Sequence, residues 1–301
     1  MASGKILKKR IASVKNTSKI TRTMEMVASA KSRRLMDRVH KAKPYSEKIL
    51  AVMAGLGGIQ GKEESPLLEV RPEKKIALVI ITANRGLCGG YNSNVIKMAR
   101  NKIKEYQSRS VAFDLFVVGK KGNAYFRFVK VPVARSIIDI DDKFEYAQAE
   151  ELANFFIDAY TEKKYDRVEV LSTFYLSAAN QRPGSMRLLP ISNEPARFDE
   201  NGEPLASREK FAIKERPANF IIEPGPAVII ARMLPLVVKV SLFKLFLEAI
   251  ASEQIYRRIA MKAATDAAKQ MIKLLTRTYN RIRQASITQE LAEIVAGADA
   301  L

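Results

Sequence analysis

KIALVIIT, residues 75–82, carries the strongest indication of the fold in this chain. It is continuously apolar and rich in β-branched residues, which is typical of a strand covered on both faces of its sheet. Similar runs follow at 111–118 and 167–174, and weaker ones lie at 126–133 and 186–191. These five segments are the strands that the sequence predicts.

Helical patterns lie between the predicted strands, at 94–106 and 145–163. Strands that alternate with helices indicate an α/β domain with a mostly parallel sheet. We therefore predict a Rossmann-like α/β domain over residues 74–195. A connector rich in glycine and proline precedes it, and a loop or insertion over 196–225 follows it.

Residues 1–55 contain almost no glycine or proline and predict a single long helix. Their apolar residues recur in steps of four and three, the spacing of a coiled coil, with breaks of phase between three segments. The predicted seam consists of Leu7, Ile11, Val14, Ile20, Met24, Val27, Leu35, Val39 and Ala42.

Residues 226–301 predict a second long helix, again with steps of four and three. Small residues along its seam would permit close approach of the partner helix. The predicted seam consists of Ala260, Ala264, Ala267, Met271, Leu274 and Thr278, widened by Ala263, Ala268 and Leu275. Because the two helices come from opposite ends of the chain, we predict a long antiparallel coiled coil that flanks the inserted α/β domain.

The chain of 301 residues has a formal charge of +19, which indicates an anionic partner such as nucleic acid, a membrane surface or an acidic protein. Residues 1–55 hold fourteen Lys/Arg against three Asp/Glu. Tyr45 is the only aromatic residue before Tyr91, so the basic helix lacks side chains on which bases could stack. Charge alone leaves two alternatives open: the basic helix binds an acidic protein, or the chain is a basic scaffold that binds nucleic acid.

The apolar stretch 226–250 is interrupted by Arg232, Lys239 and Lys244. Three cations within about 25 residues are costly in hydrocarbon, so we interpret this stretch as a helix covered by protein and expect no membrane span. Residues 1–20 are basic and lack the apolar core of a secretory signal.

Few residues could support chemistry. The single Cys88 and the single His40 exclude an internal disulfide and most metal and Ser-His sites. The glycine-rich segment 82–94 follows a strand and precedes a helix, where phosphate often binds, but it lacks both phosphate-loop spacings. We interpret it as a structural turn, with a nucleotide-binding enzyme as a further alternative. The acidic residues at 139–142 fit no calcium loop and indicate a solvated loop.

Three segments together resemble the gamma subunit of F-type ATP synthases. The first is 19–31, with KIT and MEMVASAK; the second is 85–94, with RGLCGG and NSN. The third is 261–295, with MKAATDA, YN, RQASITQEL and EIV. The order and spacing of the segments also match, and the resemblance covers essentially the whole chain.

The resemblance implies a central rotor stalk that binds no nucleotide and no cofactor and catalyses nothing itself. Its terminal helices would form a shaft inside a ring of three alpha and three beta subunits. Its α/β domain, with the epsilon subunit, would sit on the membrane ring of c subunits. Proton-driven rotation would then cycle the catalytic beta sites, and the chain would meet the membrane only through the complex.

The resemblance also implies contacts with beta subunits. Met24 would lie on the shaft near acidic beta loops, and Arg257, Gln284 and Thr288 would hydrogen-bond to beta loops. Residues 197–216 correspond to a short insertion without cysteine, which excludes disulfide regulation there. The chain starts directly at the shaft helix, so we expect a bacterial protein on the cytoplasmic side of the inner membrane.

Overall fold

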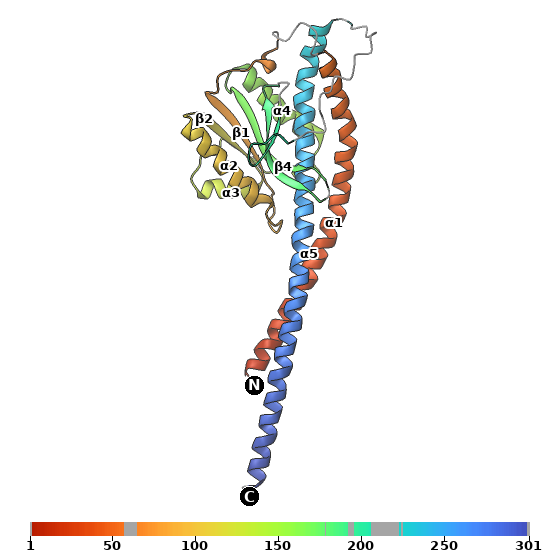
Figure 1. Cartoon of the computed structure of the whole chain (residues 1–301), viewed down its shortest axis with the longest axis vertical. Helices are drawn as coiled ribbons and strands as arrows, with labels where there is room; N and C mark the ends of the chain where they lie inside the picture. The colour runs from red at the N-terminus through yellow and green to blue at the C-terminus, as the bar shows by residue number, and fades with distance from the viewer. Residues whose placement is uncertain are drawn as a thin grey trace. The chain divides into compact units, whose positions relative to one another are not determined.

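The computed structural model describes residues 2–56, 65–177, 179–191, 196–205, 223 and 225–299. The chain is an α/β protein with a six-stranded mixed sheet and long helices at both ends, as the sequence predicts. The N-terminal helix α1 spans Ala2–Leu56 and the C-terminal helix α5 spans Pro226–Asp299. Figure 1 shows α1, α5 and the sheet, whose strands come between these two helices in the sequence.

Between the long helices lie six strands, three shorter helices and one 3-10 turn. They are η1 (Pro66–Leu68), β1 (Lys75–Ile81), α2 (Tyr91–Ser108), β2 (Ala112–Val118), α3 (Lys120–Phe128), β3 (Arg135–Ile137), α4 (Tyr146–Thr161), β4 (Arg167–Tyr175), β5 (Gln181–Leu189) and β6 (Arg197–Asp199).

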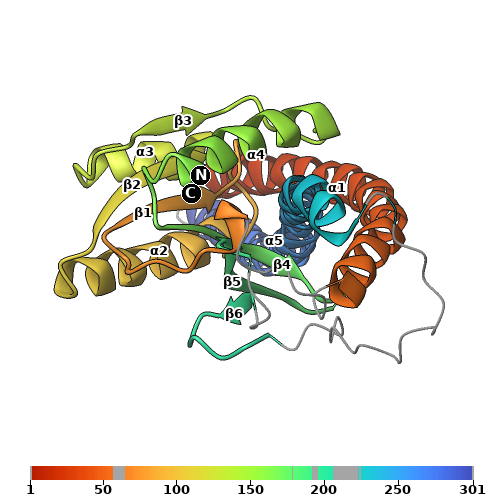
Figure 2. The same cartoon turned by 90° about the horizontal axis from the view of Figure 1, so that it is seen from above.

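The strand order is β3-β2-β1-β4-β5-β6, and Figure 2 shows the sheet running from β3 to β6 in this order. The four strands β1 to β4 are parallel, which confirms the mostly parallel sheet. β5 and β6 are antiparallel additions at one edge. β6 falls inside the range predicted as a loop, and residues 206–222 of the predicted insertion lie outside the described residues.

The strand predicted at 126–133 is wrong, because its first residues belong to helix α3 and the rest form a turn. In a strand, Phe126 and Phe128 would point to the same face, whereas in a helix they lie about 200° apart. Phe126 is fully buried and Phe128 is 84% exposed. The aromatic composition resembled a strand, but the packing follows the helical period.

The sheet has an apolar core on each face because consecutive residues of β1 point in opposite directions. Ile76, Leu78 and Ile80 pack with α2 and α3. Ala77 and Val79 pack on the other face with α4, with the second part of α1 and with the first part of α5. The early part of α5 is therefore apolar because protein covers it, as predicted. Among the described residues no helix is long and apolar enough to cross a membrane.

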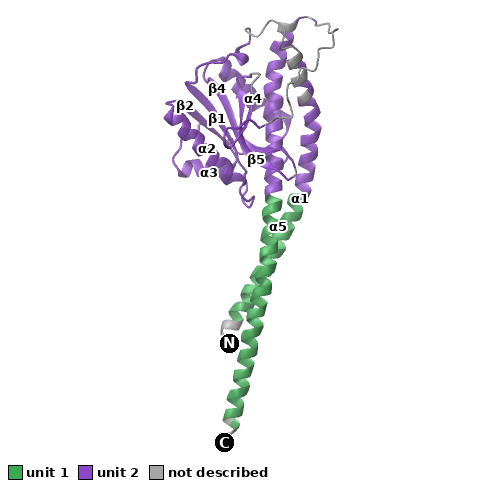
Figure 3. Ribbon diagram, in the orientation of Figure 1, with its two compact units in different colours: residues 1–29, 257–301 green, residues 30–256 purple. Residues whose placement is uncertain are grey.

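The chain divides into two compact units, shown in Figure 3. The α/β unit comprises residues 30–256, with the sheet and the adjoining parts of α1 and α5. The two-helix unit comprises residues 1–29 and 257–301. Both long helices continue from one unit into the other.

Candidate functional site: partner-facing surfaces of the two units

The two-helix unit is held together by one continuous seam in steps of four and three. Every seam position is buried or half-buried. On α1 the seam consists of Leu7, Ile11, Val14, Ser18, Thr21, Glu25 and Ala28. On α5 it consists of Met261, Thr265, Ala268, Ile272, Leu275, Tyr279 and Ile282. This spacing is that of a coiled coil, so the predicted architecture of this unit is confirmed.

The main line of the predicted seam on α5 is wrong by one residue, although Ala268 and Leu275, predicted to widen it, do lie in the seam. Met271 and Leu274 were placed in the seam, but their side chains are 52% and 64% exposed. On α1 the predicted breaks of phase do not occur, because Ser18, Thr21 and Glu25 occupy seam positions that an apolar pattern does not reveal. Apolar residues between these positions instead face outward.

The outer surface of the two-helix unit is unusually apolar. Its exposed apolar side chains are Ile6, Ile20, Met26, Val27, Ile259, Met271, Leu274, Ile287, Leu291, Ile294 and Val295. Exposed lysines and arginines separate them along both helices. Large exposed apolar residues that gather on one element mark a surface made to contact another protein. Cations among them would suit a partner with acidic groups.

The end of α5 extends beyond the start of α1. Ala2 lies 19 positions before Thr21, so α1 reaches about as far as Gln284, since Thr265 faces Thr21 and both helices rise by about 1.5 Å per residue. Residues 285–299 of α5 therefore have no α1 alongside them, as the lower end of Figure 3 shows. Leu291, Ile294 and Val295 lie on this single helix and are all more than half exposed.

The four predicted contact residues do not form one site. Gln284 and Thr288 are exposed on one face of α5, and the Thr288 hydroxyl donates to the Gln284 carbonyl at 3.0 Å. Arg257 lies 27 residues earlier, about 40 Å along the helix, and is only 8% exposed. Met24 is half-buried beside the seam of α1. Contact of these residues with beta subunits stays a prediction.

In the α/β unit, α1 is clamped to the loop that precedes α4, at a place where the sequence predicted a solvated loop. The Lys31 ammonium lies 2.9 Å from the Asp142 carboxylate, and the Arg34 guanidinium lies 3.7 Å from it. Arg38 donates to the carbonyls of Asp142 and Phe144. Lys31, Arg34 and Arg38 share one helical face, and this spacing was the signal available in the sequence.

This clamp has an electrostatic consequence. The hydrogen bond from Lys31, together with its charge and a contribution from Arg34, outweighs the opposing effect of partial burial and holds the pKa of Asp142 below its usual range. Asp142 is therefore charged at neutral pH, and its pairing with α1 favours the folded arrangement.

Helix α5 is tied to the same unit by polar contacts. The Arg197 guanidinium on β6 lies 3.1 Å from the Glu248 carboxylate and 4.9 Å above the centre of the Phe174 ring. The Lys239 ammonium lies 2.8 Å from the Glu150 carboxylate on α4. Charged groups of opposite sign therefore connect α5 to two different elements of the unit.

The glycine-rich turn is closed by its own side chains, which supports its interpretation as structural. The Asn92 side chain accepts from the Ala83 amide at 2.8 Å and donates to the Cys88 sulfur at 3.2 Å. A side chain at Gly119 would place a Cβ atom 2.2 Å from the Thr82 carbonyl oxygen, so only glycine fits there. Among the described residues, no group of three or more His, Cys, Asp and Glu could hold a metal ion.

Comparison with known proteins gives consistent matches. Residues 3–301 match the family model described as ATP synthase. The chain is 45% identical to the ATP synthase gamma chain of Leptospira biflexa, with all of both chains covered. It is 40% identical to the ATP synthase gamma chain of Gemmatimonas aurantiaca, over all of this chain and 99% of that one.

Solved structures share the fold at lower identity. A chain of the Euglena gracilis mitochondrial ATP synthase matches with a TM-score of 0.64 and 18% identity, over 99% of this chain and 94% of that one. A chain of the central stalk and c-ring structure from Tetrahymena thermophila mitochondrial ATP synthase has a TM-score of 0.58 and 23% identity, over 81% of this chain and 99% of that one.

Proposed function

The chain belongs to the ATP synthase gamma family and is a central stalk subunit of an F-type ATP synthase, and on this premise we propose that it is the rotor that couples proton-driven rotation of a c-ring to ATP chemistry in other subunits. The solved relatives carry the words rotor, central stalk and c-ring in their descriptions. The proposal assigns a mechanical task to each of the two compact units.

The two-helix unit is the shaft, and it turns within a ring of three alpha and three beta subunits. One observation carries this assignment: the end of α5 has no α1 beside it, yet it exposes Leu291, Ile294 and Val295. A lone helix with an exposed apolar stripe needs a protein surface around it. Gln284 and Thr288 lie at the start of this segment and would contact beta-subunit loops there, with Met24 and Arg257 further along the shaft.

The basic surface of the shaft favours contact with acidic loops. Residues 1–29 contain seven Lys/Arg and one Asp/Glu. Attraction between such a surface and acidic beta loops would vary with the angle of the shaft, since the cations are not evenly arranged around it. Salt would weaken this attraction because exposed charges are screened over about 10 Å at 0.1 M.

The α/β unit is the part that receives torque, and it would sit with the epsilon subunit on the c-ring. The clamp of Lys31 and Arg38 on the loop at 142–144, and the Arg197–Glu248 pair, fix α1 and α5 to the sheet. Torque applied to the sheet therefore acts on both helices, which continue into the shaft. A coiled coil resists twisting because seam residues of each helix pack against the other.

Catalysis and nucleotide binding belong to other subunits in this proposal. Within the turn at 82–94 the Asn92 side chain bonds the Ala83 amide and the Cys88 sulfur, so these groups are engaged within the chain. The chain takes no cofactor and binds no nucleic acid, and the complex places it at the cytoplasmic side of a bacterial inner membrane. A basic scaffold for nucleic acid is the alternative, and it would bind with strong salt dependence.

Native mass spectrometry of the complex purified with this chain tests the proposal. The expected result is one copy of the chain with three copies each of two larger subunits. Recovery as a free monomer, or with nucleic acid and without such subunits, would contradict the rotor assignment and favour the basic scaffold.

A further inference from the structure

A groove of about 410 Å³ lies on the α/β unit, away from the clamped helices, between the end of α3 and the edge strand β3. It is lined by Arg127, Lys130, Val131, Pro132, Val133 and Ser136. None of these residues belongs to the shaft or to the contacts that fix α1 and α5, so the rotor assignment leaves this groove unexplained.

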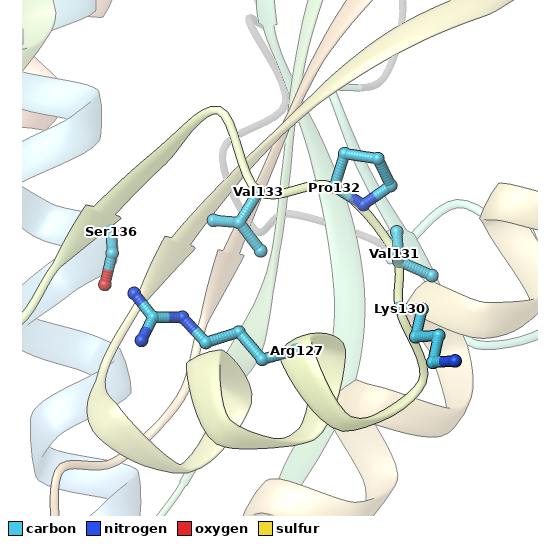
Figure 4. Close-up of a pocket in the computed structure, with 6 residues that line it drawn as sticks. All are labelled: Arg127, Lys130, Val131, Pro132, Val133 and Ser136. Carbon is cyan, nitrogen blue, oxygen red and sulfur yellow. The ribbon is translucent and has the colours of Figure 1, made fainter.

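The groove is apolar in the middle and cationic at its ends. Figure 4 shows the Arg127 guanidinium extending toward Ser136, while the Lys130 side chain points to the opposite end. Val131, Pro132 and Val133 lie between the two cations. Within the described part of the chain neither cation has an ion pair, whereas the nearby Arg135 pairs with Glu151 at 3.3 Å.

The surroundings add to the positive charge. Residues 115–138 contain five Lys/Arg and no Asp/Glu. No acidic side chain from this segment can therefore neutralise Arg127 and Lys130. A carboxylate bound at either end would gain a charge-assisted hydrogen bond without displacing an existing partner.

A large apolar side chain, although not among the lining residues, follows Arg127 directly in the sequence. Phe128 is 84% exposed, and its neighbour Val129 is also exposed. An aromatic side chain next to an arginine is the combination enriched in binding hot spots, where the aromatic group becomes buried on association. An inorganic anion or a single phosphate would leave Phe128 and the three apolar lining residues in water.

The sheet edge sets the shape of the occupant. β3 is the last strand on this side of the sheet and pairs with β2 alone among the described strands. A sheet edge offers backbone groups to an extended segment, while adjacent pockets take its alternate side chains. The groove beside β3 therefore fits extended chain better than a helix.

We propose that this groove docks an extended acidic segment of a partner protein within the ATP synthase complex. Its carboxylates pair with Arg127 and Lys130, and an apolar side chain between them packs on the Val131–Val133 floor and Phe128. The proposal rests on the proposed function only in placing the partner in the assembled complex.

Zero-length carbodiimide coupling in the purified complex tests the proposal, because it joins a lysine amine to a carboxylate in contact with it. We expect Lys130 to couple to an Asp or Glu of another subunit, in a peptide identified by mass spectrometry. Lys130→Gln should abolish this product. Phe128→Ala should lower its yield roughly tenfold, since loss of a hot-spot side chain weakens association strongly.

Lys163→Gln is the matched control. Lys163 also follows a helix with a left-handed backbone, at φ 60° against 56° for Lys130, and is exposed. This variant should leave the Lys130 product unchanged. If only substitutions at the groove lower the yield, loss of positive charge in general is excluded as the cause.

The proposal fails if Lys130 forms no such product and reacts with a soluble amine reagent as fast in the intact complex as in the free chain. It also fails if Lys130 is protected only when phosphatidylglycerol vesicles are added, which would assign the groove to lipid. Failure of the complex to assemble from the unmodified chain would instead contradict the proposed function, so the two failures are distinguishable.

Discussion

The hydroxyl oxygens of Thr21 and Thr265 lie 2.8 Å apart, across the seam of α1 and α5 and 244 positions apart in the sequence. Both side chains are buried, and Thr265 also lies 2.8 Å from the Met261 carbonyl. A hydroxyl has one proton, so it donates to one of these oxygens at a time. The contact explains how a coiled coil can place polar residues in its seam and still satisfy them.

Replacing Thr265 with valine tests the value of this contact. Valine keeps the shape but removes the hydroxyl, and we expect a loss of about 1 kcal/mol in local stability. Amide hydrogen exchange at 261–268 should then be about fivefold faster. The double variant Thr21→Val with Thr265→Val should lose less than the sum of the single variants, because neither oxygen is left alone. Additive losses would show that the two hydroxyls do not interact.

Two methionines of α5, one inside the seam and one outside it, test the corrected seam. Met261 is 5% exposed in the seam, whereas Met271 is 52% exposed outside it. In the full chain without partners, Met261→Ala should cost about 2–4 kcal/mol because it leaves a cavity. Met271→Ala should change stability by at most about 0.5 kcal/mol. Hydrogen exchange of the surrounding amides measures both, and equal losses would contradict the assigned seam.

Buried and exposed ion pairs of α5 should differ in strength. Glu248 is almost fully buried and pairs with Arg197, so Glu248→Gln leaves a poorly solvated guanidinium and should cost about 3 kcal/mol. The Glu150 side chain is 40% exposed in its pair with Lys239, and Glu150→Gln should cost at most about 1 kcal/mol. Thermal unfolding of the full chain compares the stability lost in the two variants. If Glu150→Gln lost as much as Glu248→Gln or more, the Arg197–Glu248 pair would not be the stronger one.

The clamp of α1 should weaken in acid. The pKa of Asp142 is lower in the folded chain than in the unfolded chain, so its contribution is present above the unfolded pKa of about 4. This contribution is lost as pH falls through the lower folded pKa. Unfolding temperatures measured from pH 7 down to pH 2 should therefore fall less steeply for Asp142→Asn.

The long helices and the strands β1, β2 and β4 could be predicted because their signals are local, whereas the three-residue strands β3 and β6 were not predicted. KIALVIIT at 75–82 is apolar without interruption, and β1 occupies most of it with core residues on both faces. Pro226 and the apolar residues after it likewise marked the start of α5. In each case the hydrophobic pattern of one segment was enough to specify its structure.

The errors arose where the polarity of a residue disagrees with its place in the structure. Leu274 is apolar but faces outward, while Thr265 is polar but lies in the seam, so a search for apolar steps chose the wrong face. In the proposed function, this outward leucine faces a partner subunit, which the pattern of a single chain does not reveal. Asp142 was interpreted as solvated because its partners Lys31 and Arg34 are more than 100 residues away in the sequence.

Single-molecule observation of rotation tests the central claim most directly. The complex would be immobilised through its other subunits, and a bead would be attached to this chain at Lys104→Cys, an exposed position on α2, with Cys88 replaced by serine. The account predicts that ATP drives continuous rotation of the bead in one direction. A bead that stays still while the same complexes hydrolyse ATP would contradict the assignment of this chain as the rotor.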